Sequence, residues 1–238
     1  MRIAVTIRTA NRAPHKNYLG ATVRQLLAQG VNMEDIHIAA TDPDVAWLAR
    51  ELSASTWRLD VPAAKRTPNE NGLAQIAMVE PSSYDWILLL EDDLEFCADF
   101  LGSVERWLER YARADRHVYR FFGFNVPSRP KAAYDVRLER IRASQAQALR
   151  MADALDFLAW GRAHLHDWPL QTAWGRAYTD HWRGFDKLVA SWALTRWPGQ
   201  PALASHPQFV RHVGQHSSIH ARTAWNDAAF AGRTWSFL

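Results

Sequence analysis

Apolar residues in the first part of the chain are spaced as in a strand, a helix and a second strand. A short apolar run at residues 3–7 ends in the polar stretch 8–12, and Leu19, Val23, Leu26 and Leu27 then share one helical face. Gly30 closes this helix, and residues 36–40 form a second apolar run. A strand, a helix and a strand in this order predict a right-handed parallel unit.

The next segment predicts two more helices and a strand at the centre of the sheet. A helix is expected at about residues 45–52, and a second one, carrying Leu73, Ile76 and Val79, follows the polar loop 65–72. Residues 86–90 are five apolar residues without alternation, which is typical of a strand that is buried on both faces.

The remainder of the chain has weaker patterns. We expect a helix at about residues 99–112, a strand at 117–123, a proline-containing loop at 125–131 and a largely helical stretch at 137–165. The last quarter, which is rich in Trp, His and Arg, predicts an irregular segment wrapped over the sheet. The pattern as a whole indicates an α/β fold with a mostly parallel, Rossmann-like central sheet flanked by helices.

Composition indicates one ordinary globular domain. The chain has 238 residues, 48% hydrophobic and 22% charged, and contains no long apolar segment and a single cysteine. These features predict a soluble protein of a reducing compartment, such as the cytoplasm of a bacterium or a phage-infected host. The net charge of +3 suits an anionic partner such as a nucleotide.

Three consecutive acids give the strongest chemical signal. Glu91, Asp92 and Asp93 directly follow the apolar run 86–90, and parallel sheets bind ligands outside the carboxyl ends of their strands. Carboxylate oxygens suit Mg²⁺ or Mn²⁺, which can also bind substrate phosphates. The alternative is a solvated acidic turn that ends the strand and caps the next helix.

Four short stretches, in order along the chain, resemble GT-A glycosyltransferases, and more narrowly the N-acetylglucosaminyltransferase IV family. The stretches are residues 6–8 with 18–19, residues 66–71, residues 91–94 and residues 212–218. The resemblance implies a single-domain transferase that uses a divalent ion and a UDP-sugar. It divides the chain into a nucleotide-sugar-binding half at 1–115 and an acceptor-binding half at 116–238.

The resemblance also implies roles for individual residues. Asp93 and His212 would be metal ligands, with Glu91 and Asp92 beside the nucleotide-sugar. His216, Ser217 and Ser218 would face the diphosphate. Each histidine could instead be an ordinary surface or core residue.

Further contacts to the nucleotide-sugar are expected around the first strands. The candidates are Thr6, Arg8, Arg12, Asp42, Arg66 and Asn71. Asp42 could instead cap the following helix, and Arg12 could be solvated. An inverting transfer needs a carboxylate to accept the proton of the acceptor hydroxyl, and Asp167 is the candidate, although it could equally be a helix cap.

The acceptor stays open between a glycan and a hydroxymethylated pyrimidine in DNA. A DNA acceptor would use a basic stretch that could instead be a solvated helix face: Lys131, Arg137, Arg140, Arg142 and Arg150. A Rossmann dehydrogenase is excluded because no glycine fingerprint follows the first strand. A nucleotidyltransferase and a non-catalytic nucleic-acid-binding module remain as alternatives.

Overall fold

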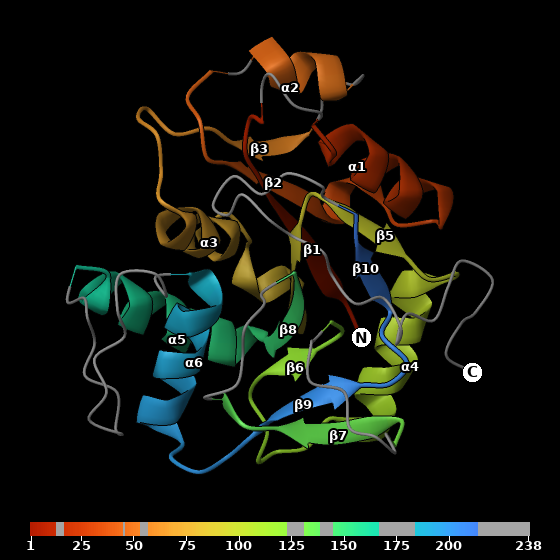
Figure 1. Ribbon diagram of the computed structural model, residues 1–238, viewed down its shortest axis with the longest axis vertical. Coiled ribbons are helices and arrows are strands. Elements are labelled where there is room, and N and C mark those ends of the chain that lie inside the picture. The colour runs from red at the N-terminus through yellow and green to blue at the C-terminus, as the bar shows by residue number, and fades with distance from the viewer. Residues whose placement is uncertain are drawn as a thin grey trace.

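The computed structural model describes residues 1–12, 17–44, 46–52, 57–122, 131–138, 145–166 and 184–213. Its centre is an eight-stranded sheet with the order β3-β2-β1-β4-β8-β6-β9-β7 (Figure 1). The strands of this sheet are β1 (Ile3–Thr9), β2 (Ile36–Ala40), β3 (Arg58–Asp60), β4 (Trp86–Glu91), β6 (Tyr119–Arg120), β7 (Ala133–Val136), β8 (Ala146–Arg150) and β9 (Ala202–Ser205).

The N-terminal half of the sheet is parallel, as the sequence predicts. β1 pairs in parallel with β2 on one side and with β4 on the other, and β3 extends the sheet beyond β2. The first five residues of β4 are buried, which confirms a strand covered on both faces. Helices α1 (Leu19–Ala28), α2 (Ala46–Glu51) and α3 (Pro68–Ala77) connect these strands, with short 3₁₀ turns at Met33–Asp35 and Pro81–Ser83.

The second half of the sheet is mixed, and here two sequence predictions are wrong. Within the described part of the stretch 137–165, residues 146–150 form β8, which runs antiparallel to both β4 and β6, and the helix α5 (Met151–His164) begins only after it. The last quarter is not irregular where it is described. It forms α6 (Phe185–Arg196), β9 and β10 (Val210–His212), while residues 214–238 lie outside the described part.

Helices cover both faces of the sheet and divide the core in two (Figure 1). One cluster packs α1 and α4 (Phe100–Tyr111) against β1, β2 and β4, through residues such as Leu19, Val23 and Trp107. The other packs α3, α5 and α6 through residues such as Leu73, Phe157 and Leu188. The sheet is therefore buried on both sides, and its strand ends are the places where polar groups can meet.

A second sheet has two strands, β5 and β10. The chain leaves β4 and forms β5 (Leu94–Phe96), which pairs antiparallel with β10, so that His212 lies opposite Leu94. The ion pair between Arg211 and Glu95 joins the two strands. This sheet brings His212 next to the acids that follow β4. No helix in the described residues is long and apolar enough to cross a membrane.

Candidate metal and nucleotide site

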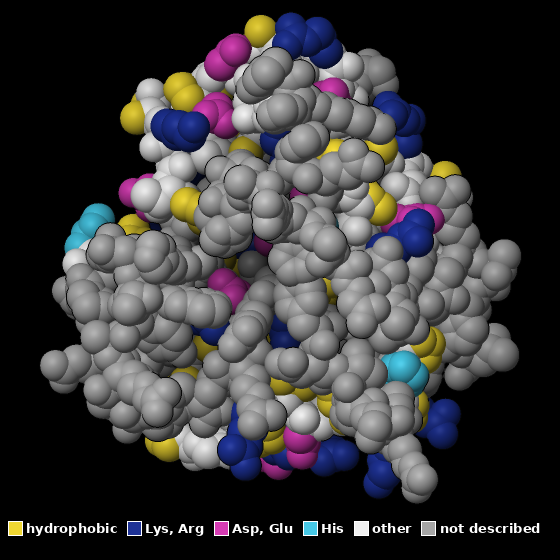
Figure 2. Space-filling view, in the orientation of Figure 1, with side chains coloured by type: hydrophobic (Ala, Val, Ile, Leu, Met, Phe, Trp, Pro, Cys, Tyr) yellow, Lys and Arg dark blue, Asp and Glu magenta, His cyan; other side chains and the backbone are white. Residues whose placement is uncertain are grey.

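The site lies at the carboxyl ends of β1 and β4. β1 pairs with β2 on one side and with β4 on the other. The carboxyl ends of the strands are the usual ligand site of an open α/β sheet. Figure 2 shows acidic side chains in a hollow near the middle of the face that Figure 1 presents.

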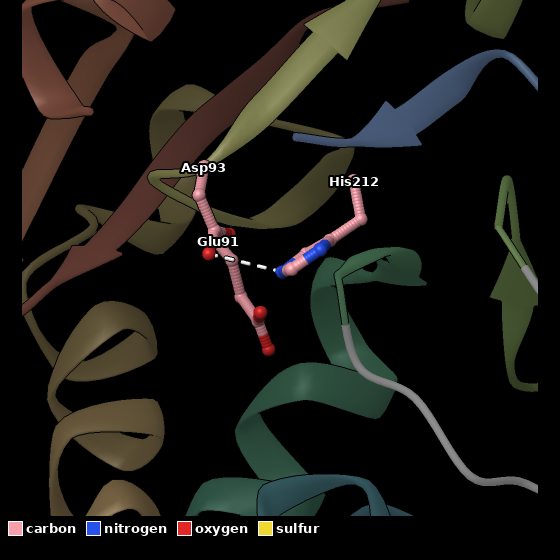
Figure 3. Close-up of side chains that lie close together, drawn as sticks. All are labelled: Glu91, Asp93 and His212. Atoms are coloured by element: carbon pink, nitrogen blue, oxygen red, sulfur yellow. Dashed lines mark ion pairs between the residues drawn. The ribbon is translucent and has the colours of Figure 1, made fainter. Parts of the chain in front are cut away.

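Glu91, Asp93 and His212 converge at this point. Each offers one ligand atom, and these atoms all lie within 4.8 Å of one another. Figure 3 shows the side chains of Glu91 and Asp93 extending from the end of β4 toward the imidazole of His212 on β10. The distance from His212 Nε2 to Asp93 Oδ2 is 3.0 Å. Asp93 and His212 are thus brought together as the sequence predicts.

Asp92 differs from Glu91 and Asp93 in its main partners. It lies with Asp93 in a bend that follows β4. Asp92 accepts two hydrogen bonds from Arg12, at 2.6 and 2.7 Å, and one from the Thr9 hydroxyl. Arg12 is therefore buried and paired rather than solvated, and Asp92 binds the loop after β1.

The three convergent residues fit a divalent cation. Two carboxylates and one imidazole are a usual donor set, and two of the three residues are buried. Asp93 Oδ1 is buried and has no hydrogen-bond partner among the described residues. A buried carboxylate oxygen without a partner is costly, and a bound cation would satisfy it.

Local electrostatics keep Asp93 ionised. Burial alone would raise the pKa of Asp93, but the hydrogen bond and charge of His212, with the charge of Arg12, bring it below the usual value. The pKa of His212 is raised for the reciprocal reason, although burial acts in the opposite direction. To ligate a metal through Nε2, His212 must be neutral, with its proton on Nδ1.

Backbone hydrogen bonds fix the segment that carries the acids. The Thr22 hydroxyl on α1 donates to the carbonyl of Asp92, and the Val213 amide donates to the carbonyl of Asp93 at 2.9 Å. Next to this segment, Arg8 on β1 forms an ion pair with Glu91, its register partner on β4. Arg8 therefore lies beside Glu91, and its contact with a nucleotide-sugar stays a prediction.

The other nucleotide candidates lie around the end of β2. Asp42 accepts a hydrogen bond from the Asn11 amide at 3.0 Å, while Asp44 accepts the bond from Ala46 at the start of α2. Asp42 therefore connects the loops after β1 and β2. Arg66 pairs with Asp60 at 2.8 Å.

Asn71 donates to Ala39 and Thr41, and its own Oδ1 is buried without a partner in the described part of the chain. The structure thus gathers Asp42, Arg66 and Asn71 near one strand end. Thr6 is different, because it is fully buried within β1 and donates to the carbonyl of Leu88. Thr6 therefore does not lie with Asp42, Arg66 and Asn71.

Three candidates, Asp167, His216 and Ser217, lie outside the described residues, as does Ser218. The basic stretch is only partly described, and one member has a structural role. Arg150 donates to the carbonyls of Arg113 and Arg116 at 2.7 Å each, and lies over the rings of Trp86 and Tyr119. Lys131 and Arg137 are exposed. Arg150 is therefore not available to line a groove.

Sequence reasoning missed Asp186, in the first turn of α6. Burial raises the pKa of Asp186, and Arg120, Arg8 and Glu91 lie within electrostatic range of it. The preceding Phe185 packs its ring under the Arg8 guanidinium, 4.8 Å from ring centre to Cζ. An acid directly after a Gly-Phe pair at a helix start is the only sequence signal, and it is a weak one.

Gly72 on α3 allows this packing. A Cβ atom at Gly72 would lie 2.1 Å from the Phe185 ring. The absence of a side chain at this position lets the start of α6 approach α3 and the end of β1. The position of Asp186 relative to the site thus depends on one glycine in another helix.

Comparison with known proteins identifies the fold. No protein-family model and no curated protein sequence matches the chain. Among solved structures, S. aureus TarS 1-349 in complex with UDP-GlcNAc aligns with a TM-score of 0.55 and 14% identity, over 92% of this chain and 60% of that one. Mannose-1-phosphate geranyltransferase from Thermus thermophilus aligns with a TM-score of 0.52 and 16% identity, over 96% and 77% of the two chains.

These similarities establish the GT-A type of α/β fold, with a large central sheet between helices. At 14 to 16% identity they carry the fold alone. The chain spans less than two thirds of the TarS structure, so its activity must be argued from its own residues.

Proposed function

We propose that the protein is a metal-dependent glycosyltransferase that takes its sugar from a UDP-sugar. The observation that carries this proposal is the convergence of Glu91, Asp93 and His212 at the carboxyl ends of β1 and β4. The TarS structure that shares the fold contains UDP-GlcNAc, and this supports a nucleotide-sugar as the ligand of this site. The four short stretches that resemble the N-acetylglucosaminyltransferase IV family support a hexose or N-acetylhexosamine donor.

In this proposal, Glu91, Asp93 and His212 hold Mn²⁺ or Mg²⁺. When bound, the ion neutralises negative charge that develops on the departing diphosphate. Arg8 fixes the Glu91 carboxylate, while Asp42, Arg66 and Asn71 contact the nucleoside at the end of β2. His216 and Ser217 belong to the predicted diphosphate contacts. Residues 1–115 provide most of the donor site, and residues 116–238 provide the acceptor side and His212.

A carboxylate must accept the proton of the acceptor hydroxyl if the transfer inverts the anomeric centre. Asp167 is the residue that the sequence resemblance indicates. Asp186 is the residue that the described structure favours, because it is a partly buried acid with a raised pKa close to Arg8 and Glu91. A raised pKa suits a general base, since it strengthens the affinity for the proton.

A nucleotidyltransferase would also use paired carboxylates and a divalent ion. It would need backbone amides to cradle a triphosphate after β1, usually with glycines. Residues 9–12 contain no glycine, and Arg12 here is bound to Asp92. The geometry therefore favours sugar transfer.

The acceptor class remains a glycan or a hydroxymethylated pyrimidine in DNA. A DNA acceptor would have to rely on exposed cations such as Lys131 and Arg137, because Arg150 is bound to backbone carbonyls. Binding to DNA would fall steeply with salt if such cations contact phosphates.

The test measures donor binding and donor hydrolysis without an acceptor. Purified protein is incubated with Mn²⁺ and each common nucleotide-sugar, and thermal stability and release of the nucleoside diphosphate are recorded. We expect one UDP-sugar to stabilise the wild type only when metal is present, and Asp93→Asn to abolish this effect.

The matched control is Asp99→Asn. Asp99 forms a surface ion pair with Arg106 and lies in a left-handed conformation, which asparagine also tolerates. The control should bind the donor like the wild type. Absence of any metal-dependent nucleotide-sugar binding by the wild type would contradict the proposal.

A further inference from the structure

Arg12 places a positive charge beside the proposed metal ligand Asp93, where it would repel a bound metal ion. Its guanidinium donates to both oxygens of Asp92, and its Nη2 also lies 3.3 Å from Asp93 Oδ2. Only 9% of its side chain is exposed. A buried guanidinium therefore contacts a carboxylate that also belongs to the metal-ligand set.

The contact with Asp93 is the weaker of the two. The bonds to Asp92 are short and bidentate, which is the strong geometry of an arginine-carboxylate pair. The contact with Asp93 is longer, involves a single nitrogen, and shares its acceptor oxygen with His212. Arg12 can therefore release Asp93 while Asp92 continues to hold it.

We propose that Arg12 is a built-in counter-cation that keeps the metal affinity of the free protein low, so that the divalent ion binds together with a nucleoside diphosphate. This inference rests on the proposed metal site. In the free protein, Glu91 is paired with Arg8, while Asp92 and Asp93 contact Arg12 and His212. The carboxylates are thus already compensated, and an added dication would meet the repulsion of Arg12 in a buried, weakly screened setting.

A diphosphate changes this balance because it brings negative charge of its own. The ion can then bind to phosphate oxygens and to Asp93 at the same time. Arg12, held on Asp92 beside the same point, attracts the diphosphate instead of only opposing the metal. Asp92 is therefore a positioning residue that fixes Arg12, and it is not counted among the metal ligands.

The experiment titrates Mn²⁺ into the protein and measures the loss of the free Mn²⁺ signal by electron paramagnetic resonance. Wild type and Arg12→Gln are compared with and without UDP, with protein-free blanks for the Mn²⁺ that UDP itself binds. Without UDP, we expect Arg12→Gln to bind Mn²⁺ about tenfold more tightly than the wild type, since it lacks the opposing charge. With UDP, the wild type should gain affinity by a similar or larger factor, and the variant should gain less.

The matched control is Arg116→Gln, which removes another largely buried guanidinium that contacts two carboxylates, Asp115 and Asp135. It should leave Mn²⁺ affinity unchanged. Thermal melting verifies that each variant is folded. If Arg12→Gln does not fold, tight Mn²⁺ binding by the wild type without UDP would still overturn the inference.

Two results would overturn the inference and leave the metal site standing. One is tight Mn²⁺ binding by the wild type without UDP, and the other is an Arg12→Gln variant with the weak affinity of the wild type. Absence of Mn²⁺ binding in every protein, with UDP present, would overturn both this inference and the proposed function.

Discussion

Gly72 lies on α3, outside the candidate metal site, but Gly72→Ala should still disturb that site through Phe185. A Cβ at this position would lie 2.1 and 2.2 Å from two carbons of the Phe185 ring, which is only 2% exposed. Ordinary carbon contacts are ~3.5 Å or more, so the ring would have to retreat by roughly 1.4 Å. Phe185 precedes Asp186 and packs under Arg8, so the start of α6 must move with it.

The expected cost is that of overpacking a close-packed core, about 1–3 kcal/mol. For a domain of this size, each 1 kcal/mol lowers the melting temperature by about 2–4 °C. Thermal unfolding measures this change, and nucleoside diphosphate release measures the activity. We expect turnover to fall more than donor affinity, because the donor side on β1 and β4 is less affected than α6.

Two further variants identify the cause. Gly161→Ala adds the same group to another helix, but there the nearest atom, at 2.7 Å, is the end of the flexible Leu73 side chain. It should therefore cost less. Phe185→Leu should recover part of the stability lost in Gly72→Ala, since the two residues are in direct contact. A Gly72→Ala protein with the stability and turnover of the wild type would refute the reasoning.

Three other predictions concern a core histidine, the pairing of β5 with β10, and the general base. Burial lowers the pKa of His37 from 6.5 to about 4. Between pH 6.5 and pH 4, the unfolded chain therefore binds a proton at His37 that the folded protein does not. Stability should fall as the pH drops through this window, by at most about 3 kcal/mol, and a His37→Leu variant should show a flatter pH dependence in urea unfolding. Glu95→Gln removes the ion pair with Arg211 that joins β5 and β10. Mn²⁺ with UDP should therefore raise the melting temperature of the variant less than that of the wild type. An equal rise would show that the ion pair does not help to position His212. Asp186→Asn should lose most turnover while it binds donor normally, and if Asp167→Asn shows this behaviour instead, Asp167 is the base.

The parallel half of the fold could be predicted because local pattern and tertiary environment agree there. The strands at residues 3–7 and 86–90 are largely apolar without alternation, and each pairs with a strand on both sides in the sheet. Residues 146–150 show the opposite case. Ala, Gln, Leu and Arg favour a helix locally, but pairing with β4 and β6 makes this segment a strand.

Helix α6 could not be predicted from the sequence, for a related reason. On α6, Lys187 and Ser191 are buried together with the apolar residues, so no polar face marks the helix in the sequence. Asp186 was missed with it.

The site could be predicted in part. Position at a strand end predicted a ligand site at residues 91–93, and the short resemblance predicted Asp93 and His212 as metal ligands, with Glu91 beside the nucleotide-sugar. The structure instead groups Glu91 with Asp93 and His212. That resemblance could not reveal that His212 lies on a three-residue strand paired with β5. It also could not reveal that Asp92 is bound by Arg12, because this contact depends on how the loop after β1 folds back onto the acids.

The most direct test of the central claim is the thermal shift given by Mn²⁺ with UDP-sugars in the wild type and in Asp93→Asn. The claim predicts a shift in the wild type that needs both metal and nucleotide, its loss in Asp93→Asn and its persistence in Asp99→Asn. An equal shift in all three proteins, or a shift that does not need metal, would contradict the assignment of Glu91, Asp93 and His212 as the metal site of a glycosyltransferase.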